Sequence, residues 1–282
     1  MFQFIRITSS ELLRMFARKR TYGGYAAFLA FNLLFLAILS RPGPSKLFRK
    51  PMENGGFAFE EYYSALTLAF AILGLTTIFL LIPFLALVAG DVVSKELEDG
   101  NLRLILSRPV SRARLLLSKF LACHIYTFTL VAFLALISFG TGALLTTWNG
   151  SMFVMTRPRE VLGVFDFETG LRRYLISAGF LTLCMSTISS VAFLFSCQNL
   201  KPAAATILTI CVFFIDRILW GVPYFQDYQN WFLTPHLRVW IQAFADPLPW
   251  GKLGWHLGIL VGISIGCFAV GWLTFRKRDL KA

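Results

Sequence analysis

The sequence predicts an all-α polytopic membrane protein with six transmembrane helices. Of its 282 residues, 56% are hydrophobic and only 15% are charged, and the mean hydropathy is +0.65. Soluble domains carry about 25% charged residues, so this composition excludes an ordinary globular core. The apolar residues are also gathered into long uninterrupted runs, which is the pattern of bilayer-spanning helices.

Five of these runs contain no Asp, Glu, Lys or Arg, and each reaches the roughly 18–20 residues needed to cross a bilayer. They cover residues 21–40, 62–90, 120–156, 174–200 and 253–275. A sixth, shorter candidate carries Asp216 and Arg217 near its far end. We therefore predict one transmembrane domain over residues 1–282, with spans at about 21–40, 64–90, 117–146, 174–197, 202–220 and 253–275.

The net charge of +12 lies in the segments that flank these runs. With six spans, one side of the membrane receives both termini and 16 Lys and Arg residues, against 11 on the other side. Because positive charge accumulates in cytoplasmic loops, we expect both termini in the cytoplasm and the chain in a plasma membrane. No aromatic–basic RNA-binding motif accompanies the charge, so no nucleic-acid partner is expected.

The sequence carries no pattern typical of a catalytic or cofactor site. Gly251-Lys252 lacks the upstream glycine spacing and the following hydroxyl residue of a phosphate-binding loop. Neither Cys/His zinc spacing nor a nucleophile elbow occurs, and the three histidines are scattered. We predict a non-catalytic chain without a cofactor or metal of its own.

Residues 1–20 are predicted to form an interfacial helix. Leu12, Leu13 and Phe16 make an apolar stripe, and basic residues lie largely off it. Such a helix lies in the plane of the lipid headgroups. Thr8 and Glu11 have the spacing of a capping box.

The second run is longer than a bilayer is thick, so its helix is expected to tilt or to kink at Pro83. We expect the helix to continue as far as Glu98, because Asp99-Gly100-Asn101 then breaks it. A short apolar helical turn is predicted over residues 102–106 and ends at Pro109.

The last span carries a glycine every four residues, at Gly254, Gly258, Gly262 and Gly266. This spacing makes a nearly continuous groove along one helix face. Small residues let transmembrane helices approach closely. The groove is predicted to pack against another helix, either within the chain or across a seam with a second copy.

Two segments between spans have distinct compositions. Residues 148–173 include several charged residues and are expected to be solvated. Residues 216–252 are rich in Trp, Tyr and Phe and contain prolines. The aromatic segment is predicted to form a membrane-interface belt or a re-entrant turn, and ligand contact is the alternative.

The loop between the second and third spans carries a family pattern. An acidic residue, a glycine, paired aliphatic residues, a Pro-hydrophobic-Ser-Arg run and a lysine occur in order at Glu96, Gly100, Leu104-Ile105-Leu106, Pro109-Val110-Ser111-Arg112 and Lys119. This pattern resembles the type-two (export-class) ABC transporter permeases, and residues 275–280 are similar to that family's usual ending. Asn101 departs from the pattern, since Thr or Ser is common after the glycine. In size and outer loops, the chain is similar to the permeases of nitrous-oxide-reductase maturation, gliding and bacteriocin immunity.

The resemblance implies a half-transporter. Two permease copies, expected to be identical, would pair with two separate ATP-binding cassette subunits that bind ATP and Mg. The loop would form a cytoplasmic coupling helix that docks on the ATPase and drives export or conformational work. The residues implied for this docking loop are Glu96, Gly100, Leu102, Ile105, Leu106, Pro109 and Arg112.

Two other functions stay open from the sequence. The first is an ATP-independent secondary carrier or channel, although ion-coupled carriers usually place carboxylates or histidines at mid-membrane depth, where this chain has few. The second is a membrane scaffold or assembly factor, which predicts stable partners without a nucleotide-dependent change.

Overall fold

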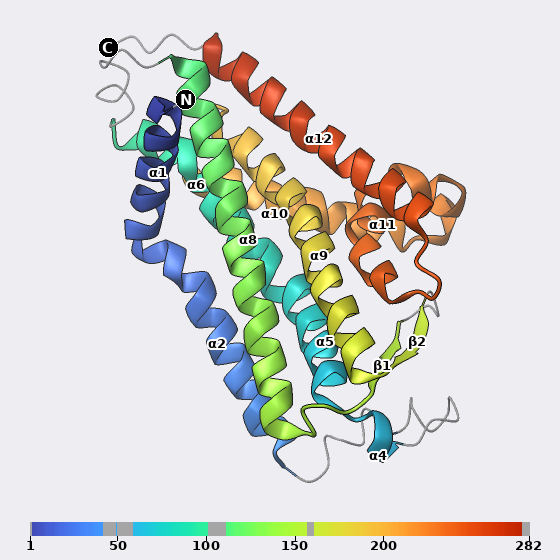
Figure 1. The fold of residues 1–282 in the computed structure, drawn as a ribbon. Coiled ribbons are helices and arrows are strands. Elements are labelled where there is room, and N and C mark those ends of the chain that lie inside the picture. The colour runs from blue at the N-terminus through green and yellow to red at the C-terminus, as the bar shows by residue number, and fades with distance from the viewer. Residues whose placement is uncertain (1, 42–48, 50–58, 101–110, 157–160, 278–282) are drawn as a thin grey trace.

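The computed structural model describes residues 2–41, 49, 59–100, 111–156 and 161–277. It is an all-α polytopic membrane protein in which six helices are long and apolar enough to cross a bilayer. These are α2 (Lys19–Leu39), the continuous second span Ala65–Glu98, α8 (Arg112–Leu145), α9 (Phe167–Ser196), α10 (Pro202–Trp220) and α12 (Trp250–Arg276). Helix α1 (Phe2–Ala17) and the end of α12 lie at the same end of the bundle (Figure 1).

The second span is continuous but not uniformly α-helical. It consists of α5 (Ala65–Thr76), a π-helical turn η1 (Thr77–Leu81) and α6 (Ile82–Glu98). Pro83 lies in the first turn of α6. Because proline donates no backbone hydrogen bond and clashes with the preceding turn, the wider π turn accommodates it. The predicted irregularity at Pro83 is therefore present as a π turn just before it.

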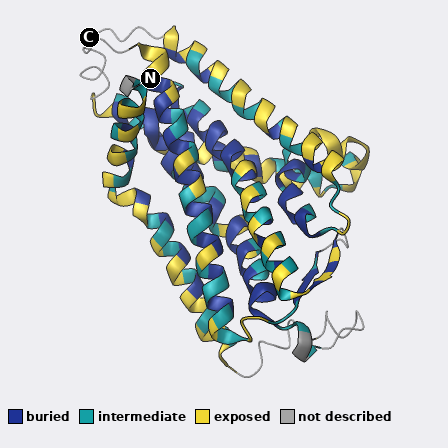
Figure 2. Cartoon of the chain, in the orientation of Figure 1, coloured by how far each residue is buried: buried dark blue, intermediate teal, exposed yellow. Residues whose placement is uncertain are grey.

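The second, third and fourth spans form the centre of the bundle. Helix α8 packs against α5, α9 packs against α6, and α2, α10 and α12 cover the outside (Figure 1). Within the apolar 18-residue stretch of each helix, only 17% of residues in α2, 17% in α10 and 11% in α12 are buried within the chain, compared with 56% in α9. Figure 2 shows the same contrast, since the outer helices expose apolar faces that lipid or another protein would cover.

Two glycines allow close helix contacts. A Cβ at Gly142 of α8 would overlap the backbone carbonyl group of Ala65 at the start of α5. A Cβ at Gly90 of α6 would lie 3.0 Å from the Oγ1 of Thr206 on α10. The second and third spans therefore touch through backbone at one end, and the second and fifth spans touch near the other.

Residues 148–173 are not simply a solvated loop. Strands β1 (Met152–Met155) and β2 (Leu162–Phe165) pair antiparallel, with Met152 opposite Phe165 and Met155 opposite Leu162. Met152, Val154 and Phe165 are buried in the same core as the helices. The charged residues of this segment favoured a solvated loop, whereas β1 buries three consecutive residues and β2 buries every second one.

The aromatic segment 216–252 divides into an exposed part and a buried part. The 3-10 helix η2 (Pro223–Trp231) is exposed, with Trp231 88% accessible. Helix α11 (Leu233–Leu237) and the 3-10 helix η3 (Val239–Phe244) instead pack into the bundle, where Trp240 and Phe244 contact Phe70 of α5. Only the exposed part can serve as an interface belt. The short helix α4 (Phe59–Tyr62) precedes the second span.

Helix α1 begins well before the predicted capping box. Thr8 lies inside the helix, where its Oγ1 donates to the carbonyl of Phe4, and Glu11 turns toward α8. The capping-box interpretation is therefore wrong, because each side chain has a different partner. Leu12 and Phe16 pack on the core as the stripe predicts, whereas Leu13 is exposed.

Candidate functional site

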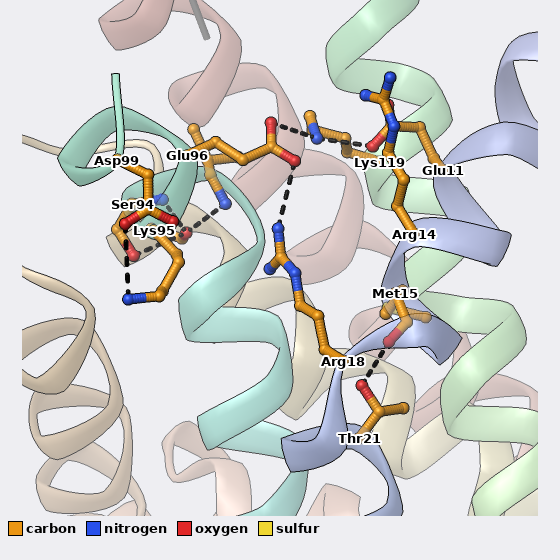
Figure 3. A network of polar contacts seen from close by, with 12 residues as sticks. Glu11, Arg14, Met15, Arg18, Thr21, Ser94, Lys95, Glu96, Asp99 and Lys119 are labelled. Atoms are coloured by element: carbon orange, nitrogen blue, oxygen red, sulfur yellow. Dashed lines mark hydrogen bonds and ion pairs between the residues drawn. The ribbon is translucent and has the colours of Figure 1, made fainter. Parts of the chain in front are cut away.

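A network of buried charges joins three helices at the end of the bundle that holds α1. Lys119 of α8 lies between Glu11 of α1 and Glu96 of α6 (Figure 3). Its Nζ is 2.6 Å from Glu11 Oε2 and 2.7 Å from Glu96 Oε2. Lys119 is 1% exposed, and both glutamates are almost as deeply buried. One ammonium group therefore links the second span, the third span and the N-terminal helix.

Arginines at the junction of α1 and α2 complete this network. Arg18 has an extended backbone that separates the two helices, and its guanidinium lies 3.3 Å from Glu96 Oε1. Arg14 pairs with Glu11 at 3.2 Å. Each buried carboxylate thus contacts two cations, which lessens the desolvation penalty of a buried charge.

A second ion pair joins α2 to α6, more than one helical turn away from Glu96. Arg20, in the first turn of α2, lies 3.0 Å from Asp91 Oδ2 of α6. Asp91 is the first charged residue after the apolar run of the second span. The first and second spans are therefore joined through both Glu96 and Asp91.

The fourth span is bonded to the same part of α6. The Ser196 hydroxyl, at the last residue of α9, accepts hydrogen bonds from the backbone N–H groups of Val93 and Ser94, each at 2.9 Å. A displacement of this end of α6 would therefore be transmitted to α1, α2, α8 and α9.

The network lies at the base of the predicted docking loop. Helix α6 ends at Glu98, and Gly100 follows with φ +70°, the left-handed conformation that favours glycine after a helix. On the other side, Ser111 caps α8 by accepting a hydrogen bond from the Arg114 N–H. Both ends of the loop are thus fixed by local sequence signals.

The structure brings together only part of the predicted loop site. Glu96 is buried in the charge network, and it is not available to a partner on the surface. Gly100 and Arg112 lie at the two ends of the loop, and Arg112 donates to the carbonyl of Arg276 at the end of α12. The remaining predicted residues, Leu102, Ile105, Leu106 and Pro109, lie outside the described residues, as does the predicted coupling helix.

The glycine groove of the last span does not pack within the described part of the chain. At Gly254, Gly258, Gly262 and Gly266, an added Cβ would meet no described atom within 4 Å. The reason is geometric, because α12 contacts α9 through its other face, where Gly271 approaches Cys197. The alternative of a seam with another chain stays a prediction.

Sequence reasoning missed Glu11, Arg18 and Asp91 as members of one site. Two signals were present in the sequence. Glu11 is the only acidic residue in an otherwise basic and apolar N-terminal segment, and Asp91 and Glu96 immediately follow a long apolar run. Acidic residues in such places need buried partners, although the sequence does not say which cations supply them.

The arrangement is suited to holding helices together. Among the described residues, no group of three or more His, Cys, Asp or Glu side chains could hold a metal ion. Every carboxylate of the network is paired with a cation. The network can therefore transmit a displacement between helices as a connected unit.

Comparison with known proteins places the chain in a family but gives it no activity. No curated protein matches the chain. One family model, described as "Protein of unknown function (DUF2705)", matches residues 30–281. The match covers all six spanning helices except the first part of α2. This six-span membrane chain therefore belongs to the DUF2705 family.

Proposed function

We propose that this protein is the membrane-spanning permease subunit of an ATP-driven ABC transporter. In this proposal, separate ATP-binding cassette subunits bind and hydrolyse ATP, and the chain converts their motion into export or into conformational work across a bacterial inner membrane. Both termini and the loop 99–111 face the cytoplasm. The chain itself has no catalytic role.

The observation that carries the proposal is the position of the buried charge network. The two helices that flank the loop are joined directly beneath it by Lys119 and Glu96. A soluble subunit that pushes on the loop would therefore move α6 and α8 together, as a rigid body. The Glu11 contact would carry the same motion to α1.

Asp216, an acidic residue within the α10 span, is not arranged as an ion-coupling site. Both Asp216 oxygens accept hydrogen bonds, from the backbone N–H groups of Leu233 and Thr234 and from the Thr234 hydroxyl. This carboxylate is engaged in holding α11 against α10. Its structural use favours the ATP-driven function over an ion-coupled carrier.

Replacing Ile105 by aspartate is expected to abolish binding of the ATP-binding subunit while the permease stays folded. The resemblance places Ile105 in the apolar part of the docking loop, and a charge there would have to be desolvated on docking. Co-purification from mild detergent measures the retained subunit. The matched control is Arg103→Lys in the same loop, which keeps both charge and length. An Ile105→Asp chain that retains the subunit and its ATPase activity would exclude this loop as the docking site.

The glycine groove gives a separate test of the expected homodimer. Gly258→Leu with Gly262→Leu is expected to leave each chain folded, because neither position contacts the described chain, but to remove the dimer on native gels. Gly251→Leu is the control, since it lies on the same helix outside the four-residue series and is equally open. A double variant that migrates like the unmodified chain would argue against the seam.

A further inference from the structure

A cavity of about 550 Å³ lies between the second and fifth spans, lined by residues 70–82 of the second span and residues 213–220 of the fifth. This volume is in the range of small-molecule sites. Its walls are mainly apolar side chains from α5, η1, α10 and η3, including Phe70, Leu75, Ile78, Phe213, Trp240 and Ile241. The cavity exists because α10 packs closely on α6 at Gly90, whereas α11 and η3 separate α10 from α5 farther along the fifth span.

The two cationic side chains of the cavity lie beside one tryptophan. Arg217 and Arg238 both line it, and their guanidinium carbons lie 5.9 Å and 5.2 Å from the centre of the Trp220 ring. No Asp or Glu is among the described lining residues. Asp216, the neighbouring acid, is already occupied by three donors from α11.

Trp220, which lines the cavity, carries a buried hydrogen-bond donor. Its indole Nε1 is buried and has no hydrogen-bond acceptor among the described residues. A buried donor left without an acceptor is unfavourable. The π turn η1 also opens onto the cavity through Thr77 and Ile78, and such turns are frequent at functional sites.

We propose that this cavity binds an anionic amphiphile, a molecule with an apolar chain and a phosphate, sulfate or carboxylate head. The head would accept hydrogen bonds from Arg217, and from Trp220 Nε1 once the indole turns toward it, and would lie close to Arg238. The chain would occupy the apolar space between η1 and η3. The inference deepens the proposed function by naming the class of molecule that the permease recognises. It rests on the proposed function only for the identification of the chain as a permease.

The test is photolabelling of the purified chain in phosphatidylcholine nanodiscs by dodecyl phosphate with a diazirine at the chain end. We expect saturable labelling within residues 70–82 and 237–244. Unlabelled dodecyl phosphate should compete, and dodecyltrimethylammonium should not. The assay contains neither nucleotide nor ATP-binding subunit, so its failure is distinguishable from failure of the permease proposal.

Two variants test the polar end of the cavity. Arg217→Gln is expected to raise the half-saturating concentration at least about tenfold, because a charge-assisted hydrogen bond is lost. Trp220→Phe keeps the ring and removes the donor, and it should raise that concentration about threefold or more. Arg172→Gln is the control, since Arg172 is an exposed arginine of α9 outside the cavity.

The outcomes are separable. Labelling that is not saturable, that spreads equally over α2 and α12, or that is unchanged in both variants would overturn the proposal. Doping the nanodiscs with phosphatidic acid then distinguishes the source of the ligand. Competition by the lipid supports binding of a bilayer amphiphile, and saturable labelling without such competition supports a soluble one.

Discussion

Replacing Lys119 by methionine is expected to lower the free energy of unfolding by about 3–5 kcal/mol, the range found when one partner of a buried ion pair is removed. The variant keeps the length and apolar stem of the side chain. It leaves Glu11 and Glu96, which are 6% and 4% exposed, without the ammonium group between them. Thermal unfolding in a mild detergent measures the loss as a lower Tm.

Two further variants make this result specific. Lys201→Met is the control, because Lys201 is exposed and its side chain does not cap α10. Adding Glu96→Gln to Lys119→Met is expected to restore part of the lost stability, since it removes one of the two buried carboxylates that have lost their ammonium partner. If Lys119→Met and Lys201→Met unfold at the same temperature, the network does not hold α1, α6 and α8 together.

Gly142→Ala is expected to be the most damaging single-methyl substitution in the bundle. The new Cβ would overlap the carbonyl oxygen and carbon of Ala65, and these backbone atoms cannot rotate away as a side chain can. Overpacking of this kind lowers the free energy of unfolding by about 1–3 kcal/mol and occasionally more. The same thermal assay in detergent measures it.

Gly140 provides a matched control on the same helix. An added Cβ at this position meets no described atom within 4 Å, so Gly140→Ala should be neutral or slightly stabilising through helix propensity. Close contact between α5 and α8 therefore predicts that Gly142→Ala lowers the Tm, whereas Gly140→Ala, two residues away, leaves it unchanged or raises it. Equal Tm values for the two variants would show that this contact is not tight.

The spans could be predicted from the sequence because charge is expensive in a bilayer. The first predicted span, 21–40, corresponds closely to α2 at Lys19–Leu39. The third and fourth spanning helices, α8 and α9, instead begin several residues before the predicted spans. Their starts are set by capping residues, Ser111 and Asp166, each of which accepts a backbone hydrogen bond. An apolar run marks the region in lipid, whereas a cap marks where the helix begins.

The charge network could not be predicted because it is a tertiary feature. Glu11 and Lys119 are 108 residues apart, and Arg18 and Glu96 are 78 residues apart. Neither pair has a helix-spacing signature, unlike Lys95 and Asp99, which are four residues apart. The hairpin Met152–Phe165 was missed for a related reason, since its burial depends on packing against the helices.

The central claim is that the chain works with a separate ATP-binding subunit. The most direct test is affinity purification of the chain from its native membrane in mild detergent, followed by identification of co-purifying proteins and an ATPase assay. The account predicts a subunit with a phosphate-binding loop and ATP hydrolysis in the purified complex. A chain that purifies alone and without ATPase activity, under conditions that preserve other membrane complexes, would contradict it.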